Sequence, residues 1–534
     1  MTAERTQGHL EFELKLAVPR DARDALRRAF LLPRSRPRML RLQARYFDTD
    51  DRALAKAGMA LRVRREGRRW VQTLKTTAIG EVGRQEFEIA RPDGSLDLEA
   101  LSHTPAAKVL GRRLHLPELR SGGQPGSESE SPCQAVLGLR YQTSIRRWVR
   151  TQRVRGGVVE LAFDEGRILA GDRAIEVCEL EIELIKGSPR VVFDVARRWR
   201  ERFGLLVDAR SKAERGDLLA MGGDTPAPTR AAAVTLGRHV DVAEGFAVCV
   251  RSCVAQVLRN ASALALANGG YEHVHQLRVG IRRLRSAWRF FVGWLEPIPE
   301  HRAEGARALF AALGADRDLA VLAEEVEPRI LAAGMPGACF ARGEASGSRA
   351  ADAVRTPQVQ AWLLELLESI ECPAPPERQS PASGSPTVPS GETGRIEVSP
   401  GPAIGARRLK PLAANRLGRW HEGLVAPADR FAELDEMQRH SLRKRAKRLR
   451  YALEFSAALF DAKRVKRYLG RLTELQEALG ELNDLAVARS AYAAKGDSQA
   501  AWYARGWIAA RSSACEAEAE AALVRVRGCE LPWK

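Results

Sequence analysis

The feature that most constrains the fold of this 534-residue chain is an internal repeat in its C-terminal part. HQLRVGIRRLRSAWRFF begins at His275, and the similar HSLRKRAKRLRYALEFS begins at His440, 165 residues later. ALGADRDLAV at 312–321 returns as ALGELNDLAV at 478–487, with seven of ten positions identical and an offset of 166. Two matches at nearly one offset indicate a duplicated unit, and its Ala, Leu, Arg and Glu content predicts helices.

The part of the chain before residue 222 has a different pattern. Short segments of alternating polarity, such as HLEFELKLA and CELEIELIKG, are separated by turn signals. This rhythm predicts antiparallel hairpins that close into a barrel, with a few helices beside them. GGDTPAPTR at 222–230 is typical of a linker, and the Pro/Gly-rich stretch 372–394 is too polar to pack.

The predicted fold class is therefore α+β. A closed antiparallel β-barrel with flanking helices comes first, and a duplicated all-α bundle follows. The expected boundaries are 1–221 for the barrel, 222–234 for a linker, 235–371 for the first helical half, 372–405 for a disordered insertion and 406–534 for the second half.

The charge of the chain indicates its kind of partner. A formal charge of +18 and a pI near 9.9 favour a polyanion: nucleic acid, an anionic membrane or polyphosphate. No helix-turn-helix, finger or aromatic-rich motif supports nucleic acid. No run approaches the roughly 20 apolar residues of a spanning helix, and no signal core is present, so we expect a soluble cytoplasmic protein without a membrane partner.

Each copy of the repeat carries a column of cations. On a helix, positions 0, 3, 7 and 10 fall within an arc of about 80° beside an apolar stripe. These positions hold His275, Arg278, Arg282 and Arg285 in the first copy, and His440, Arg443, Lys447 and Arg450 in the second. A solvated basic face is the ordinary interpretation of such a run. The recurrence of the column in both copies instead favours a bound chain of phosphates, which would relieve the repulsion between like charges.

The histidines at the heads of these columns are not expected to be catalytic, because the motif supplies no Ser, Cys or Asp partner. Arg317-Asp318 and Asn483-Asp484, in the second repeated motif, are expected to orient the helices or the arginines. The columns and the ALGxxxDLAV motif resemble the CHAD domain, the conserved-histidine α-helical domain, over roughly 235–530 with 372–405 unmatched. The resemblance implies two pseudo-symmetric helical bundles whose basic columns bind inorganic polyphosphate.

Several N-terminal segments predict strands with one charged and one apolar face. In HLEFELKLA, the side chains of Glu11, Glu13 and Lys15 share one face, because strand side chains alternate. The same pattern recurs in three further strands, with Arg62 and Arg64, with Arg84, Glu86 and Glu88, and with Glu179, Glu181 and Glu183. Four such strands predict a barrel with a charged lumen and an apolar exterior.

A lumen of this composition suits phosphate chemistry. A triphosphate carries about four to five negative charges near neutrality, and arginine and lysine compensate for its lost hydration. Clustered carboxylates need cations to stay ionised, and Mg²⁺ or Mn²⁺ with oxygen ligands meets that need. A metal that bridges phosphate oxygens stabilises the attack of water. Acids for a metal beside bases for phosphate predict a phosphohydrolase.

The order of these motifs over about 210 residues resembles the CYTH domain of the triphosphate tunnel metalloenzymes. ExExK corresponds to Glu11, Glu13 and Lys15, and RxR, RxExE and ExE correspond to the three strands above. Lys75, Asp164 in a DxG element and Lys212 in SKAERG complete the match. In the strand at 140–150, either Arg146 or Arg147 faces inward, and Arg146 is the residue assigned to the site.

The resemblance implies roles for these residues. Glu13 and Lys15 are the candidate catalytic residues, and the carboxylate that activates water stays undecided. The expected phosphate ligands are Lys15, Arg62, Arg64, Lys75, Arg84, Arg146 and Lys212. The expected metal ligands are Glu11, Glu13, Glu86, Glu88, Asp164, Glu179, Glu181 and Glu183.

The predicted function is a Mg²⁺- or Mn²⁺-dependent inorganic triphosphatase, which cleaves tripolyphosphate to pyrophosphate and phosphate, tethered to a polyphosphate-binding module. One alternative is a non-catalytic polyphosphate-binding protein. The others are a nucleotide or thiamine triphosphatase and an adenylate cyclase, since the resembled superfamily includes such activities.

Overall fold

The computed structural model describes residues 9–32, 37–77, 82–101, 107, 110–111, 137–267, 269–314, 321–340, 346–372 and 404–534. The expected disordered insertion at 372–405 falls almost entirely outside them. By packing, the chain forms two compact units. One comprises 1–229, 257–274 and 350–372, and the other comprises 230–256, 275–349 and 373–534. No helix among the described residues is both long and apolar enough to cross a membrane.

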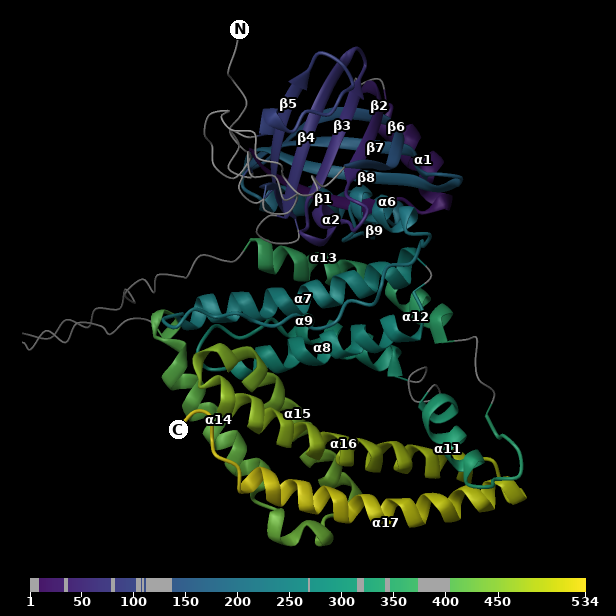
Figure 1. The fold of residues 1–534 in the computed structure, drawn as a ribbon, viewed down its shortest axis with the longest axis vertical. Coiled ribbons are helices and arrows are strands. Elements are labelled where there is room, and N and C mark those ends of the chain that lie inside the picture. Colours follow the sequence, from purple (N-terminus) through teal and green to yellow (C-terminus); the bar gives the residue numbers. More distant parts are fainter. Residues whose placement is uncertain are drawn as a thin grey trace, which may run out of the picture. The chain divides into compact units, whose positions relative to one another are not determined.

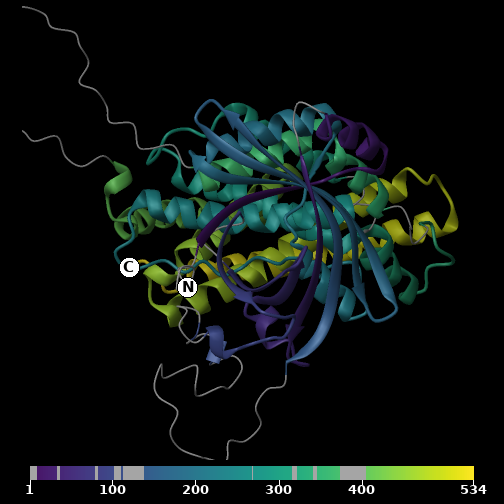
Figure 2. The same ribbon diagram turned by 90° about the horizontal axis from the view of Figure 1, so that it is seen from above.

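The first unit contains a nine-stranded antiparallel sheet (Figure 1). Its strands are β1 His9–Ala17, β2 Arg38–Asp48, β3 Ala60–Glu66, β4 Arg69–Thr77, β5 Gly83–Arg91, β6 Gly138–Val154, β7 Gly157–Ala170, β8 Arg173–Gly187 and β9 Leu206–Val207. They follow the order β5-β4-β3-β2-β6-β7-β8-β1-β9. The N-terminal end of β1 also pairs with β5, with Glu11 opposite Arg84. Figure 2 shows how strongly the strands curve.

The predicted α+β class is confirmed, in that an antiparallel sheet precedes an all-helical region. Full closure of the barrel stays a prediction. The alternation of the strands is as expected: Leu14 and Leu16 on one face of β1 are 3% and 0% exposed, while Glu13 and Lys15 lie on the other face. We call the face of the sheet that carries Glu13 the inner face.

Helices cover the outer face of the sheet. Helix α5, Arg190–Phe203, packs on β1, β7 and β8, and its Phe193 meets Phe12 edge to face at 6.2 Å. Helix α1, Arg23–Phe30, brings Phe30 to within 5.8 Å of Phe163. The apolar residues that alternate with the charges therefore bury against amphipathic helices, which leaves the charges on the concave side.

One end of the inner face is apolar and is covered by helix α6, Lys212–Ala220. Ser211 caps this helix in a capping box with Glu214. A Cβ atom at Gly216 would lie 2.2 Å from the ring of Tyr141, so only glycine allows the helix to approach so closely. Tyr141 stacks on Tyr46 at 4.5 Å between ring centroids. The apolar cluster is Leu42, Ala44, Tyr46, Tyr141, Ile145, Ile168, Ala170, Val177 and Leu219.

The remaining helices follow the sheet in sequence. They are α7 Val242–Leu266, α8 Tyr271–Phe291, α9 Glu300–Ala312, α11 Glu327–Ala332, α12 Ser346–Arg355, α13 Pro357–Glu371, α14 Leu409–Val425, α15 Glu436–Ser456, α16 Ala462–Ala493 and α17 Gln499–Arg527, with a π-helical turn at Leu322–Val326. The short α2, Ala53–Lys56, lies earlier in the chain, between β2 and β3. The two copies of the first repeated motif form α8 and α15, each 21 residues long. The helices expected for the repeat are therefore confirmed. Helices α16 and α17 pack along each other (Figure 1).

The compact units differ from the boundaries expected from sequence, which stay predictions. The C-terminal part of α7 and the whole of α13 group with the sheet. The Val207 amide in β9 donates to Gln360 Oε1 of α13 at 2.8 Å, and the Ala209 amide donates to Ser262 Oγ of α7 at 3.1 Å. These buried polar contacts explain the grouping, because each satisfies a backbone donor that a sheet edge would otherwise leave unpaired.

Candidate functional site

Strand β1 brings the expected ExExK residues to the middle of the inner face. The Lys15 ammonium lies 3.0 Å from Glu13 Oε2, and the Lys75 ammonium lies 2.9 Å from Glu11 Oε2. All four side chains are mostly buried, with exposures of 8% to 18%. Lys75 and burial act on Glu11 in opposite directions, and the cation prevails, so the pKa of Glu11 falls well below its usual range.

A wall of cations lies on β3 and β4, as expected. Arg62 pairs with Glu86 at 3.1 Å, and Lys75 pairs with the other oxygen of Glu86 at 3.0 Å. Arg64 contacts Glu66 and lies 3.4 Å from Glu88. Glu86 and Glu88, which were expected to hold a metal, are thus partners of these cations. The side chain of Arg84 is not among those that the structure describes.

Strand β6 overturns one assignment. Arg147, and not Arg146, reaches the acids of the inner face: its Nε and Nη2 donate to the two oxygens of Asp164 at 2.7 Å each. Arg147 also contacts Glu181, whereas the Arg146 side chain is 63% exposed. The cause is register, because Arg147 lies opposite Asp164 and side chains of opposed residues share a face.

A trio of buried carboxylates surrounds the expected closing lysine. Oxygen atoms of Asp164, Glu179 and Glu181 lie within 4.8 Å of one another. The Lys212 ammonium contacts all three, at 2.7 Å from Asp164 and 2.8 Å from Glu181. Arg215, which sequence reasoning missed, pairs with Glu179 at 2.8 Å. This trio is already neutralised, so a divalent ion would bind there only if Lys212 moved away.

A second row of acidic side chains crosses the inner face on β7, β8 and β1. Glu160, Glu183 and Glu13 lie opposite one another across β7, β8 and β1. Burial, together with the charge of Glu11, raises the pKa of Glu183 to about 7, and burial with Glu181 raises the pKa of Glu13. Burial and neighbouring carboxylates therefore oppose the ionisation of these acids, even though the Lys15 ammonium lies 3.0 Å from Glu13. Carboxylate oxygens are the ligands that a hard divalent cation prefers, and among the described residues of the sheet the carboxylates that lie within 4.8 Å of one another are those of Asp164, Glu179 and Glu181.

Sequence reasoning missed Glu160, although a signal was available. Glu160 precedes Asp164 by four residues in a strand, and residues four apart share a face. Burial raises the pKa of Glu160, as it does for Glu183.

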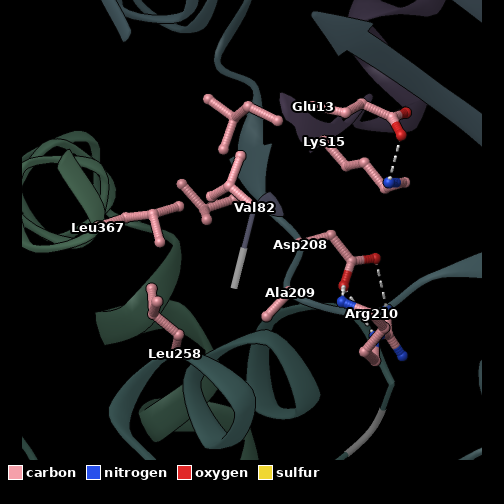
Figure 3. A pocket seen from close by; sticks show the side chains of 10 residues that line it. Glu13, Lys15, Val82, Asp208, Ala209, Arg210, Leu258 and Leu367 are labelled. Atoms are coloured by element: carbon pink, nitrogen blue, oxygen red, sulfur yellow. Dashed lines mark hydrogen bonds and ion pairs between the residues drawn. The ribbon is translucent and has the colours of Figure 1, made fainter. Parts of the chain in front are cut away.

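A small pocket lies beside β1 (Figure 3). Glu13 and Lys15 line it from β1, and Asp208 pairs with Arg210 in the segment after β9, with Oδ1–Nε at 2.9 Å and Oδ2–Nη2 at 3.0 Å. Leu258 of α7 and Leu367 of α13 contribute apolar walls within the same compact unit. Helices from the later part of the chain therefore border the strand that carries ExExK.

In the second unit, the first basic column gathers around one aromatic ring. Arg278 is 9% exposed, donates to the Phe310 carbonyl at 2.8 Å and stacks over the Phe310 ring at 4.1 Å. Arg282 and Arg285 lie 5.8 and 5.9 Å from the centre of the same ring. Phe310 was missed from sequence, because its contact depends on how α9 packs on α8. The ring therefore offers cation–π attraction chiefly to Arg278, while Arg282 and Arg285 lie at the outer limit of such contacts.

The second column lies close to the first. The pKa of Lys447 falls to about 7, chiefly through burial and then through the charges of Arg443 and Arg282. Because Arg282 belongs to the first column, the two columns interact electrostatically. Arg450 departs from this pattern, since it pairs with Glu454 at 2.7 Å. That acid stands four residues further along the helix and could have been read from the sequence.

His440, at the head of the second column, contacts a residue of the second repeated motif. His440 Nδ1 and Asn483 Oδ1 are 3.0 Å apart, and Asn483 comes from the second copy of ALGxxxDLAV. This contact orients the imidazole, whereas Asn483 was expected to orient the helices or the arginines, and that role stays a prediction. Arg317 and Asp318 lie outside the described residues, and His275 lies on α8 as predicted.

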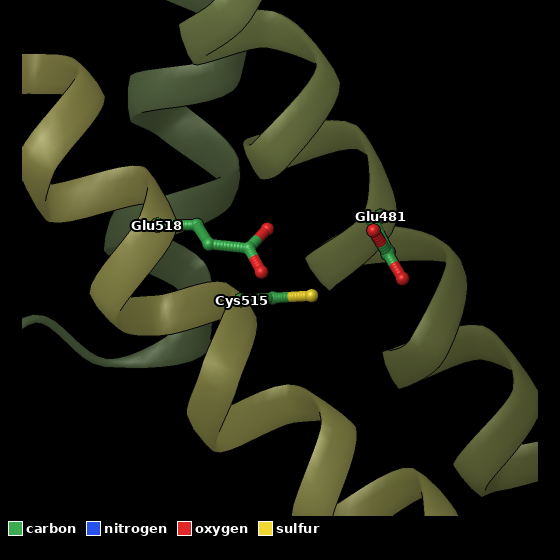
Figure 4. A group of neighbouring side chains, drawn as sticks. All are labelled: Glu481, Cys515 and Glu518. Atoms are coloured by element: carbon green, nitrogen blue, oxygen red, sulfur yellow. The ribbon is translucent and has the colours of Figure 1, made fainter.

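A further acidic group lies on α16 and α17 (Figure 4). Glu481 and Glu518 flank Cys515, but Arg511 donates to both carboxylates, at 2.8 and 3.0 Å. Hydrogen bonds from Arg511 and Arg329 lower the pKa of Glu481 to about 2, and burial raises that of Cys515 to about 11. The group is a helix-to-helix ion pair, and its charges are satisfied.

Comparison with known proteins gives two family matches. The profile of the CYTH domain matches residues 9–216, and that of the CHAD domain matches residues 249–493. A curated relative, the inorganic triphosphatase of Haemophilus influenzae, is 29% identical over 174 residues. The match covers 33% of this chain and 44% of that relative, so the chain spans less than half of its length.

Solved structures similar to this chain include the following two. The CHAD domain from the plant Ricinus communis is 26% identical, with a TM-score of 0.45, over 57% of this chain and 98% of that one. A Hippeastrum protein, described as an adenylyl cyclase with a dominant triphosphatase activity, is 20% identical, with a TM-score of 0.27, over 38% and 92%. Together with the two profiles, the inner face and the paired columns identify the chain as a protein with an N-terminal CYTH domain and a C-terminal CHAD domain.

Proposed function

We propose that the sheet unit is a divalent-metal-dependent inorganic triphosphatase, which adds water to tripolyphosphate and releases pyrophosphate and phosphate. One observation carries the proposal: the cations Arg62, Arg64 and Lys75 share an inner face with buried carboxylates, among them Glu13 and Glu183. Arginine and lysine side chains bind the phosphate groups of a polyphosphate, and carboxylates bind the divalent metal ion that phosphate also coordinates. The relative named inorganic triphosphatase supports the same reaction.

We propose different roles for the basic and the acidic residues of the inner face. Arg62, Arg64, Lys75 and Arg147 hold the phosphoryl groups by charge-assisted hydrogen bonds and fix their orientation. Glu13 and Glu183 would hold Mg²⁺ or Mn²⁺, which supplies stabilisation of charge on the phosphate oxygens during the attack of water. Lys15, 3.0 Å from Glu13, keeps that carboxylate in place. We propose that the sheet forms a closed tunnel, and the pairing of β1 with both β8 and β5 supports this.

The test is phosphate release from purified full-length protein. We expect release from tripolyphosphate with Mg²⁺ or Mn²⁺, and none after chelation by EDTA. ATP and thiamine triphosphate, assayed in parallel with a search for cyclic AMP, distinguish the nucleotide and thiamine activities. Absence of turnover on all three substrates would contradict the proposal.

For the helical unit, we propose binding of inorganic polyphosphate along the two basic columns. The depressed pKa of Lys447 supports this: burial lowers it first, and the charges of Arg443 and Arg282, one from each column, lower it further, so a polyanion would favour the charged lysine. Binding of polyphosphate without any turnover would instead favour the non-catalytic alternative. The neutralised trio at Lys212 is the observation in favour of that alternative.

A further inference from the structure

The inner face contains one buried hydroxyl group that lacks a partner. Thr73, in β4, is 0% exposed, and its Oγ1 makes no hydrogen bond to any described residue. Thr73 shares the inner face with Lys75, two residues further along the strand. Buried hydroxyl groups are normally satisfied, so an orphan on this face needs an explanation.

The neighbouring residue Gln72 is also buried, but the fold supplies hydrogen bonds to its side chain. Gln72 is also 0% exposed but points to the outer face. Its Nε2 donates to the Asp97 carbonyl at 2.6 Å, and its Oε1 accepts from the Asp97 amide at 2.8 Å. The outer buried polar group is fully used by the fold, while the inner one is not.

The missing hydrogen bond of Thr73 is stronger evidence for a ligand than the missing hydrogen bonds of the nearby arginine Nε atoms. The Nε atoms of Arg62 and Arg64 are also buried without a partner, but arginine Nε atoms elsewhere in the described chain share that property. A threonine hydroxyl on a short, stiff side chain cannot easily turn to a distant partner. The fold therefore leaves this hydroxyl without a hydrogen bond on the inner face, where a bound ligand could supply an acceptor.

The surroundings define the kind of ligand. Register places Thr73 directly opposite Arg62 on one side and Glu88 on the other. Tyr46 lies opposite Arg62, with its hydroxyl 3.5 Å from Arg62 Nη1. Glu88 is the nearby acceptor, yet it lies 3.4 Å from Arg64 and makes no hydrogen bond with Thr73 among the described contacts. A donor set of one hydroxyl and several cations calls for an anion rich in acceptor oxygens.

We propose that Thr73 is a substrate-binding residue, whose hydroxyl donates a hydrogen bond to a non-bridging phosphoryl oxygen held by Arg62 and Lys75. This inference rests on the proposed triphosphatase function and adds a neutral donor that the charged motifs do not contain. Arginine and lysine attract the anion over a range of positions. A hydroxyl fixed on a strand selects one position of the phosphoryl group, because its hydrogen bond depends on distance and angle.

The test uses the isosteric variant Thr73→Val in the full-length protein. We expect kcat/KM for tripolyphosphate to fall about 10-fold, mainly through KM, since the bond is made to the bound anion. Calorimetry with tripolyphosphate and no added divalent cation should show a similar loss of affinity. Thr73→Ser should restore both values to within about 3-fold, because it keeps the donor.

A second measurement separates ligand binding from a structural role. Loss of an unpaired buried hydroxyl does not weaken the fold, so the melting temperature of free Thr73→Val should be no lower than that of the wild type. Thr143→Val is the matched control. Thr143 is 5% exposed on the inner face of β6, opposite Ala44 and Ile168 in the apolar region, and its variant should bind and turn over normally.

The outcomes are distinguishable. The assignment of Thr73 is wrong if Thr73→Val binds tripolyphosphate as tightly as the wild type. It is also wrong if Thr73→Ser is impaired as much as the valine variant, or if Thr73→Val melts well below the wild type. If wild-type protein neither binds nor cleaves tripolyphosphate, the proposed function itself fails.

Discussion

The inner face of the sheet and the paired columns of the helical unit are both rich in cations, but they manage charge differently. On the inner face, Arg62, Lys75 and Lys212 each contact carboxylates on neighbouring elements. In the columns, burial and then the charges of Arg443 and Arg282 lower the pKa of Lys447 to about 7. Chemistry on a phosphate needs acids for a metal as well as bases, whereas attachment of a polyanion needs bases alone.

The largest effect is expected from removing an acid of the inner face, because hydrolysis should need this acid and polyphosphate binding should not. Glu13→Gln should reduce tripolyphosphate hydrolysis by about 1,000-fold, because it removes a carboxylate that we propose as a metal ligand. Phosphate release is the measurement. Polyphosphate binding to the helical unit should be unchanged in the same variant, and a loss of both would show that the two regions do not act separately.

The next effect concerns stability. Arg147→Met should lower the free energy of unfolding by about 3 kcal/mol, because Asp164 and Glu181 lose a buried partner. Arg146→Met, at an exposed position, is the matched control and should change it by less than about 0.5 kcal/mol. Denaturant titration measures both. Equal effects would mean that Arg147 is not the inward residue.

A smaller effect is expected in the columns. The triple variant Arg443→Ala/Lys447→Ala/Arg450→Ala should weaken polyphosphate binding by about 100-fold and reduce the salt dependence of log K by about 2 units of slope. Titration at several salt concentrations measures this. Hydrolysis of tripolyphosphate serves as the control, and a comparable fall in hydrolysis would place part of the catalytic site in the columns.

The smallest effect is a dependence on pH. Lys447 has a depressed pKa of about 7 in the folded protein, and a bound polyanion favours its charged form. Binding therefore takes up a proton, so affinity should fall as pH rises through 7, by at most about 10-fold per pH unit. In the absence of ligand the sign is opposite: the folded state gains stability between pH 7 and the ordinary lysine pKa. Lys447→Met should remove the dependence of binding, and its persistence would assign the proton to another group.

Sequence patterns predicted much of this arrangement, because strand and helix periods are local. The alternation around Glu11 and Glu13 and the helical columns at His275 and His440 could be read directly. The choice between Arg146 and Arg147 could not, because two adjacent arginines differ only by register against β7. Likewise, contact of Lys212 with three acids depends on where α6 docks, and no local pattern encodes that.

Because α13 and part of α7 group with the sheet, the sheet unit cannot be separated from the later chain at the linker without losing contacts. Gln360 and Ser262 hold the backbone of Val207 and Ala209, just before the segment that carries Lys212. A polypeptide ending at the linker would lose both supports, so its closing lysine would be poorly placed. Recombination that exchanges whole modules between relatives would have to retain these two helices with the sheet, or find replacements for them. The compact unit that contains the sheet is therefore larger than the N-terminal segment that the sequence motifs define.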